Sequence, residues 1–188
     1  MKTNEQEQSS KKPFGARKIA GIAIFTALAY CISFLEFAIF PQVPFLKIDF
    51  SNVFIMLAGF MYGPIVALFV GIVKELLRLI GSSTFGVGEI ANFSIILAYV
   101  LPPTIFYVKF KGRKVVYCLL AVACLMQTAV ALLVNKFITF PLYGMADLFN
   151  SVVWFLVAFN LIKSILVSLL IIVLYKRIGR IFERMNIK

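Results

Sequence analysis

Long apolar runs dominate the chain, and polar residues gather in the short segments between them. A helix that crosses a lipid bilayer needs about 20 mainly apolar residues. Runs of this kind predict six spanning segments, at residues 19–38, 50–63, 64–80, 89–108, 115–135 and 151–175. The pattern therefore predicts an all-α integral membrane protein whose six helices pack in one bundle.

The second and third segments share one apolar stretch, which Gly63 and Pro64 divide. Glycine suits the end of one helix, and proline suits the first turn of the next. The division leaves a second segment of about 14 residues, which at 1.5 Å per residue reaches only ~21 Å. We expect so short a helix either to be buried among its neighbours or to start below the outer surface of the membrane.

Composition agrees with a membrane protein and argues against other classes. Of the 188 residues, 62% are hydrophobic and only 14% are charged, against about 45–50% and ~25% in ordinary soluble domains. A soluble domain of this size has too little interior to hide so many apolar side chains. A soluble enzyme and a disordered chain are both disfavoured.

Basic residues set the expected orientation of the bundle. Fourteen of the nineteen precede the first span, join the fourth to the fifth, or follow the sixth. With six spans these three segments fall on one side, and positive charge marks the cytosolic side. Both termini are therefore expected in the cytosol, with residues 1–12 a flexible tail and 13–188 one transmembrane domain. The net charge of +11 then reflects topology and lipid contact rather than nucleic-acid binding.

Catalytic and metal chemistry lack their usual residues. The chain has no histidine, which removes His-ligated metal sites and Ser-His-Asp triads. Cys31, Cys118 and Cys124 lie inside apolar runs and are interpreted as packing residues. No pair of carboxylates lies deep in a span, so acid–base catalysis is disfavoured. We expect no catalytic residue, metal or catalytic cofactor.

Lys163 is the most unusual polar residue. It lies about twelve residues into the sixth span, too deep for its side chain to reach either surface easily. Asn160 precedes it by three residues and shares its helix face. Their donors and acceptor can hold the edge of a planar, carbonyl-rich ligand. The alternative is a hydrogen-bonded helix pair without a ligand.

Several other polar residues admit a structural interpretation. Asp49 precedes the second span and could cap that helix. Glu75 and Arg78 are three residues apart in the third span and could pair with each other. Polar residues of the fifth and sixth spans are expected to bond neighbouring helices; they are Gln127, Ser164 and Ser168.

A stripe of alanines marks the first span, at Ala16, Ala20, Ala23 and Ala27. Small residues in one stripe let another helix approach closely. The stripe serves either packing within the bundle or docking to a partner subunit.

Five short motifs resemble those of one transporter family. They are KIDFSN at 47–52, MYGP at 61–64, GVGEIANF at 86–93, FNLIK at 159–163 and the alanine pair at 23 and 27. Together they run from the first span to the sixth. The chain is similar to the S components of energy-coupling factor (ECF) transporters, and most to their riboflavin-specific members.

The resemblance implies a six-helix bundle with an outward-facing pocket that binds riboflavin with high affinity. It also implies that the first outward loop, residues 39–49, acts as a lid. Transport in this family requires a transmembrane T protein and two ATP-binding-cassette ATPases. The chain contains no G-x-x-x-x-G-K-[ST] motif, in agreement with an ATP site on other subunits.

Carried over by position, the family's flavin contacts on the sixth helix match Asn160 and Lys163. The T-protein docking motif matches Ala23 and Ala27. Weaker matches give further expected ligand contacts, at Phe45, Leu46, Gly86, Glu89, Asn92 and Asn135.

Two other functions stay open. An S component for another vitamin is possible, because the carboxylate of a ligand such as biotin would also suit Lys163. The second is a self-sufficient secondary transporter. Proton coupling in such a transporter would need carboxylates deep in the spans, and the sequence shows no inverted repeat.

Overall fold

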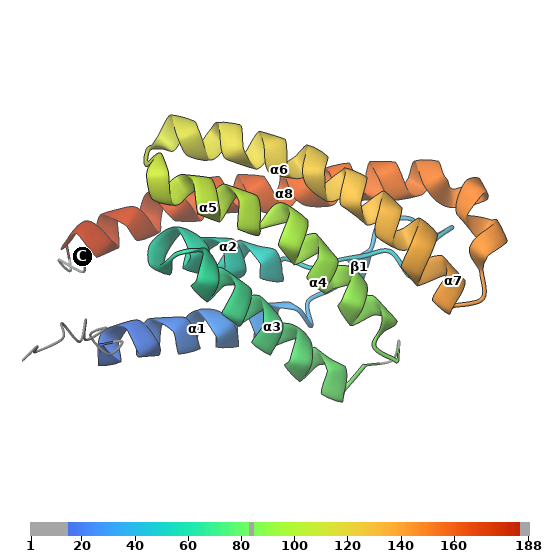
Figure 1. Cartoon of the computed structure of the whole chain (residues 1–188), viewed down its shortest axis with the longest axis horizontal. Coiled ribbons are helices and arrows are strands. Elements are labelled where there is room, and N and C mark those ends of the chain that lie inside the picture. Colours follow the sequence, from blue (N-terminus) through green and yellow to red (C-terminus); the bar gives the residue numbers. More distant parts are fainter. Residues whose placement is uncertain (1–14, 83–84, 185–188) are drawn as a thin grey trace, which may run out of the picture.

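The computed structural model describes residues 15–82 and 85–184, so the expected tail at residues 1–12 lies outside the described part. Within that part, six successive helical units pack into one bundle (Figure 1). The first three are α1 (Ala16–Ile32), α2 (Ser51–Tyr62) and α3 (Pro64–Ile80). The fourth joins α4 (Val87–Tyr99) to α5 (Leu101–Lys109), with two prolines at the start of α5.

The last two units are continued by irregular turns. α6 (Arg113–Val134) extends through the π-helix η1 (Asn135–Thr139) into α7 (Phe140–Leu142). The short 3-10 helix η2 (Ala146–Leu148) leads into α8 (Phe149–Arg184). Both units therefore run beyond the limits predicted from the sequence. The six-helix fold itself is confirmed.

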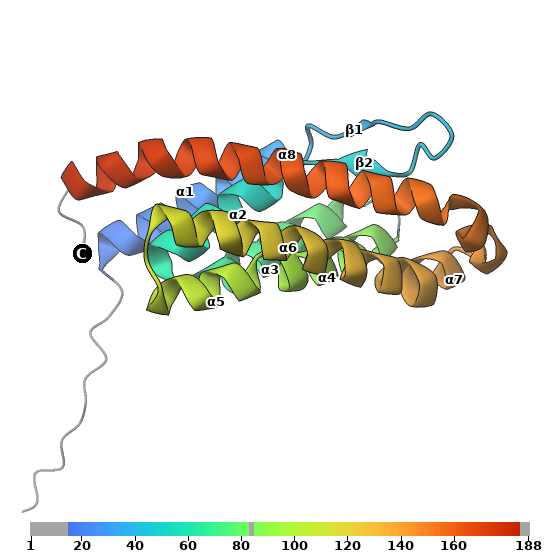
Figure 2. The same ribbon diagram turned by 90° about the horizontal axis from the view of Figure 1, so that it is seen from above.

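The bundle has two distinct ends. The start of α1, the α5–α6 connection and the end of α8 lie together at one end, here called the basic end (Figures 1 and 2). The described bases of the three basic segments belong to this end; they include Lys18, Lys109, Lys111, Arg113, Lys114, Lys176 and Arg177. The loops that follow α1, α3 and α7 lie at the opposite end, here called the loop end.

The break between α2 and α3 falls where the sequence predicts it. Gly63 has a φ of 99°, which glycine adopts without a steric penalty, and Pro64 opens α3. α2 has only 12 residues, about 18 Å of helix, and nine of them are buried. A helix too short to span a bilayer is thus enclosed by its neighbours, as expected.

The first span is shorter than predicted. α1 ends at Ile32 rather than continuing to residue 38. The chain then forms strand β1 (Phe37–Ala38), which pairs antiparallel with β2 (Lys47–Ile48). The apolar residues after Ile32 serve the loop instead of a helix, since Phe40 packs against Phe155 of α8 with ring centroids 5.6 Å apart.

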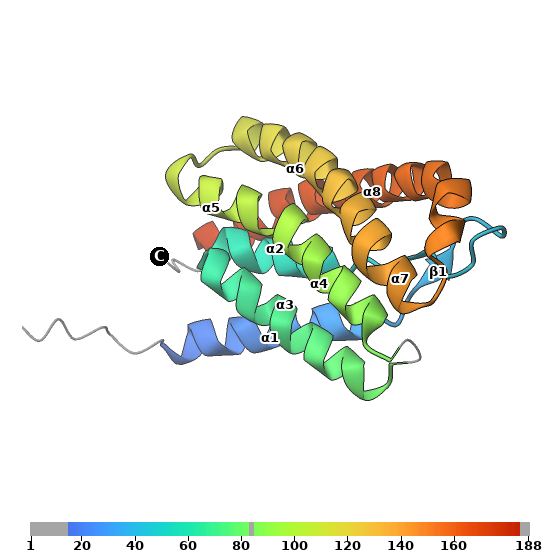
Figure 3. The ribbon, with the colours of Figure 1, turned by 45° about the vertical axis from the view of Figure 1, so that its right-hand side comes forward.

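Length and composition fit a protein that crosses the membrane several times. Among the described residues, three helical stretches are long and apolar enough to span a bilayer: Val87–Lys109, Arg113–Leu142 and Ala146–Arg177. The last two pack along each other (Figure 3). Large apolar side chains also cover the outside of the bundle; Ile65 and Trp154 are 81% and 78% exposed. Such a surface suits contact with lipid rather than water.

Candidate ligand-binding site

An ion pair joins the middle of α8 to the connection before α2. The ammonium of Lys163 lies 3.2 Å from Asp49 Oδ2, and the two residues are only 3% and 6% exposed. They are 114 positions apart in the chain. Lys163 is therefore as deeply buried as its sequence position predicts, and its charge is matched by a carboxylate.

Asp49 is held in place by its own turn. The backbone N–H of Ser51 donates to Asp49 Oδ1 at 2.9 Å, and the Ser51 hydroxyl donates to the same oxygen. Burial alone would raise the pKa of Asp49, but Lys163, Lys74 and the Ser51 bonds hold that pKa well below its usual range. Asp49 is therefore a carboxylate at neutral pH. The residue at the N-cap of α2 is Phe50 rather than Asp49, although Asp49 accepts from the first backbone N–H of the helix. Asp49 also pairs with Lys163, which the sequence did not indicate.

Asn160 lies one turn before Lys163 and is 2% exposed. Its amide nitrogen donates to the Leu156 carbonyl at 2.9 Å. Its oxygen Oδ1 is buried and accepts no hydrogen bond from the described residues. A buried acceptor without a donor costs about 1–3 kcal/mol and calls for an explanation. A hydrogen-bond donor on a bound ligand would satisfy this oxygen.

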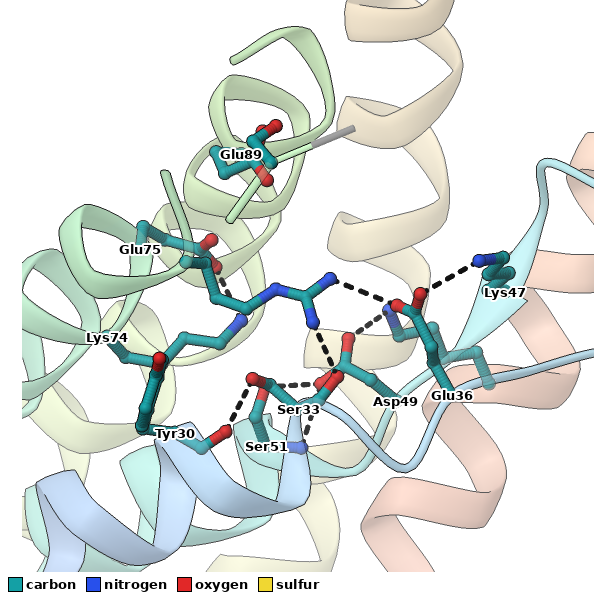
Figure 4. Close-up of polar contacts among 12 residues, drawn as sticks. Tyr30, Ser33, Glu36, Lys47, Asp49, Ser51, Lys74, Glu75 and Glu89 are labelled. Atoms are coloured by element: carbon teal, nitrogen blue, oxygen red, sulfur yellow. Dashed lines mark hydrogen bonds and ion pairs between the residues drawn. The ribbon is translucent and has the colours of Figure 1, made fainter. Parts of the chain in front are cut away.

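A second buried pair lies on α3. Lys74 donates to Glu75 Oε1 at 2.7 Å, and both residues are buried. Glu75 Oε2 has no hydrogen-bond partner among the described residues. Asp49 and Lys163 form one such pair, and Glu75 and Lys74 form the other. Glu89 is a third buried carboxylate on this side of the bundle, and its charge acts on Glu75 (Figure 4).

Arg78 does not pair with Glu75, which corrects the expectation from their spacing. Its guanidinium instead donates to Glu36 Oε2 at 3.1 Å and to the Ser33 carbonyl at 3.0 Å. Glu36 Oε1 also accepts from Lys47 at 2.9 Å. Glu36 thus ties β2 and the end of α1 to α3 (Figure 4).

The loop between β1 and β2 packs against the loop-end part of α8. Its buried side chains pack with aromatic and aliphatic residues of α7 and α8 in one cluster: Val43, Leu46, Ile48, Phe140, Phe149, Leu156 and Phe159. Leu46 is 8% exposed, whereas Phe45 is 48% exposed and contacts Phe140 with ring centroids 5.9 Å apart. The loop therefore belongs to the same buried cluster as Phe159, the residue before Asn160.

The remaining expected contacts lie on other elements. Glu89, at the start of α4, is 9% exposed and accepts from the Ser82 hydroxyl at 2.9 Å. Gly86 precedes α4 with a φ of 88°. Asn92 is half-buried. Half-buried Asn135 donates to the Ala131 carbonyl of its own helix at 2.7 Å.

The alanine stripe of α1 lies on the surface of the bundle and faces away from the other helices. Ala16, Ala20, Ala23 and Ala27 are all exposed, whereas Ala29 is fully buried. Packing inside this bundle therefore does not explain the stripe. Of the polar residues expected to join helices, Ser168 does so, since its hydroxyl lies 2.7 Å from the Tyr99 hydroxyl.

Three comparisons with known proteins agree with one another. A family model described as "ECF transporter, substrate-specific component" matches residues 17–175. A riboflavin transporter, RibU, of Staphylococcus aureus is 32% identical over 176 residues, which cover 89% of this chain and 93% of that protein. A riboflavin transporter, FmnP, of Bacillus subtilis is 28% identical over 165 residues, covering 81% of this chain and 86% of its own.

A solved structure of the S component of a bacterial ECF transporter matches the fold. It superposes with a TM-score of 0.77 and 32% identity, covering 88% of this chain and 97% of that one. The match therefore includes nearly all of the bundle.

Proposed function

Because the chain belongs to the family of substrate-specific (S) components of ECF transporters, we propose that it binds riboflavin at the outer face of a bacterial cell membrane. The loop end of the bundle faces outward, and the basic end, with both termini, faces the cytosol. Residues 13–188 act as one transmembrane domain. Relatives named as riboflavin transporters support this ligand.

The unpaired oxygen of Asn160 beside buried Lys163 is the observation that carries the proposal. Riboflavin is planar and neutral at pH 7, and its pyrimidine edge carries two carbonyls and one N–H. The N–H can donate to Asn160 Oδ1, which accepts nothing from the described residues. The Lys163 ammonium has donors left for a carbonyl after its bond to Asp49.

Aromatic and aliphatic side chains supply the walls for the rest of the flavin. Phe140, Phe149 and Phe159 form one buried cluster with the loop, and pockets for small ligands are mostly apolar with a few placed polar groups. Leu46 and Phe45 close the site from the loop. The ribityl hydroxyls meet polar groups nearer the mouth, supplied by Asn92, Asn135, Glu89 and the backbone at Gly86.

Release into the cytosol depends on other subunits. The sequence has no ATP-binding loop motif, and the family implies an ECF T protein with two ATPases. Exposed Ala23 and Ala27 of α1 form the surface on which a T-protein helix approaches closely. The chain binds and delivers its substrate without a catalytic residue or a catalytic cofactor.

The second candidate is capture of another vitamin, such as biotin. A carboxylate ligand would be favoured by an unpaired buried ammonium. Lys163 is already paired with Asp49, so its charge gives little net attraction to an anion. The pairing favours a neutral ligand, and therefore riboflavin.

Two experiments test the proposal together. Riboflavin is titrated with the purified protein in detergent, and the quenching of its fluorescence is followed in the presence and absence of biotin as a competitor. We expect quenching that saturates at one riboflavin per chain and that biotin does not reverse. Uptake of labelled riboflavin is then measured in cells with and without the T protein and ATPases, and uptake without them would contradict the dependence on partners.

A further inference from the structure

Asp49 occupies a position that the proposed ligand contacts do not use. It lies on the connection between β2 and α2, and so follows the loop directly in the chain. Its carboxylate is fixed by two bonds from Ser51 and lies 3.2 Å from the Lys163 ammonium. The loop end of the bundle therefore supplies a rigid counter-charge to the one cation proposed to contact the ligand.

The charge in direct contact with the Lys163 ammonium depends on Asp49. Lys74 has a carboxylate of its own in Glu75, at 2.7 Å. Removal of the Asp49 charge would leave Lys163 as a buried ammonium with no described carboxylate in ion-pair contact. In a site shielded from water, an isolated charge strongly favours a ligand of the opposite charge.

We propose that Asp49 is the specificity-determining residue that cancels the Lys163 charge and sets the site for a neutral ligand. The inference rests on the proposed function, because it assumes that Lys163 meets the flavin edge. Asp49 acts through Lys163 and need not touch the flavin. It aims the ammonium at a carbonyl and removes the site's preference for anions.

The test compares a neutral flavin with an anionic one of nearly the same shape. The probe is 8-hydroxyriboflavin, whose acidic hydroxyl is ionised at neutral pH and whose negative charge spreads to the pyrimidine ring. Dissociation constants for riboflavin and for this probe are measured on the wild type and on Asp49→Asn. The substitution keeps the size and an acceptor for Ser51 but removes the charge.

We expect the wild type to bind riboflavin more tightly than the probe. Asp49→Asn should shift the ratio of the two constants toward the anion by at least about tenfold, which corresponds to 1.4 kcal/mol. Bound probe should also change its absorption spectrum, because a nearby cation holds the negative charge in the pyrimidine ring. A purely structural role for Asp49 would weaken both ligands alike.

Glu36→Gln is the matched control. It also removes one carboxylate near the loop, but its partners are Lys47 and Arg78, so the ratio should not change. If Asp49→Asn does not fold, Lys163→Met gives the reverse case. Asp49 then loses its ion-pair partner, and the ratio of the two dissociation constants should shift toward riboflavin and away from the anionic probe. An unchanged ratio in the folded Asp49 or Lys163 variant would overturn the inference. A wild type that does not bind riboflavin would instead overturn the proposed function.

An independent observation concerns the opposite end of the bundle. A groove of about 290 Å³ lies along α5 and α6, next to the connection between them. Its lining is apolar except for one lysine: Phe106, Phe110, Lys114, Val115, Cys118 and Leu119. The groove therefore combines a surface for a hydrocarbon chain with a cation at the basic end.

Exposed bases alternate with the lining residues along this part of the sequence. Lys109, Lys111 and Arg113 are all exposed, as is Lys114. No Asp or Glu occurs between Glu89 and Asp147, so α5 and α6 themselves contain nothing to neutralise these charges. We infer that the groove binds one anionic phospholipid, with an acyl chain against Phe106 and Phe110 and the headgroup phosphate at the bases.

Two exposed cysteines provide the assay. Cys118 lines the groove, whereas Cys31 lies on α1 away from it. Detergent-purified protein is treated with N-ethylmaleimide in mixed micelles containing phosphatidylglycerol or phosphatidylcholine, and each cysteine is followed by peptide mass spectrometry. We expect phosphatidylglycerol to slow the reaction of Cys118 at least about fivefold and to leave Cys31 unchanged.

Lys114→Gln should abolish the difference between the two lipids. Equal protection by both lipids, or equal protection of both cysteines, would overturn the inference. Native mass spectrometry of the same samples gives a second readout, and retention of phosphatidylcholine as often as phosphatidylglycerol would also contradict it.

Discussion

Lys163→Met tests whether the buried lysine serves the ligand or only the fold. Methionine keeps much of the length of the side chain but removes the ammonium. The change leaves Asp49 buried, with its bonds from Ser51 but without the partner at 3.2 Å. The single variant therefore changes stability and binding together, and a second variant is needed to separate them.

The two effects have different expected sizes. Removal of one partner of a buried ion pair costs about 3–5 kcal/mol of stability. Replacement of both charges by neutral groups is often close to neutral, so Asp49→Asn combined with Lys163→Met should recover most of that loss. Loss of a hydrogen bond from a charged donor to the ligand costs about 1.5–3 kcal/mol. That is a decrease in riboflavin affinity of about tenfold to 100-fold, in the double variant as well as the single one.

Thermal unfolding in detergent measures stability, and quenching of riboflavin fluorescence measures affinity. The expected result is a double variant that unfolds near the wild-type temperature and yet binds riboflavin at least tenfold more weakly. Wild-type affinity in the stable double variant would refute the reasoning, because Lys163 would then be only a partner for Asp49.

Two further predictions concern the ligand and the partner subunit. Asn160→Leu removes the amide bond to the Leu156 carbonyl together with an oxygen that accepts no bond from the described residues. It should therefore lower stability by no more than about 1.5 kcal/mol, but should lower riboflavin affinity at least tenfold. A large melting shift with unchanged affinity in the same titrations would contradict this. Ala23→Trp adds bulk on an exposed face, so riboflavin binding to purified protein should stay at the wild-type level while cellular uptake is lost. Loss of binding itself would show that the alanine stripe serves the site rather than a partner.

The helices were largely predictable because local signals determine them. The apolar runs predict six segments, and Gly63 with Pro64 marks the boundary of α2 and α3. The failure at the end of α1 has a physical reason. Hydropathy does not distinguish an apolar residue of a spanning helix from one that packs a loop against the bundle, and Phe40, half-buried against Phe155, belongs to the second class.

The electrostatic partners were not predictable from spacing. The three-residue spacing of Glu75 and Arg78 on one helix face predicts an ion pair between them. Arg78 instead donates to Glu36, which lies 42 positions earlier in the chain. The partner of Lys163 lies 114 positions away, and no local pattern indicates it. The depth of Lys163 in an apolar run did predict that it would be buried, because that property depends on the run alone.

The absorbance spectrum of the purified protein tests the central claim most directly. Protein from cells grown with riboflavin should show the visible absorption bands of a bound flavin, at an intensity that corresponds to one flavin per chain. Denaturation should release the colour, and mass spectrometry should identify riboflavin. A colourless protein that also fails to quench added riboflavin would contradict the assignment of this ligand.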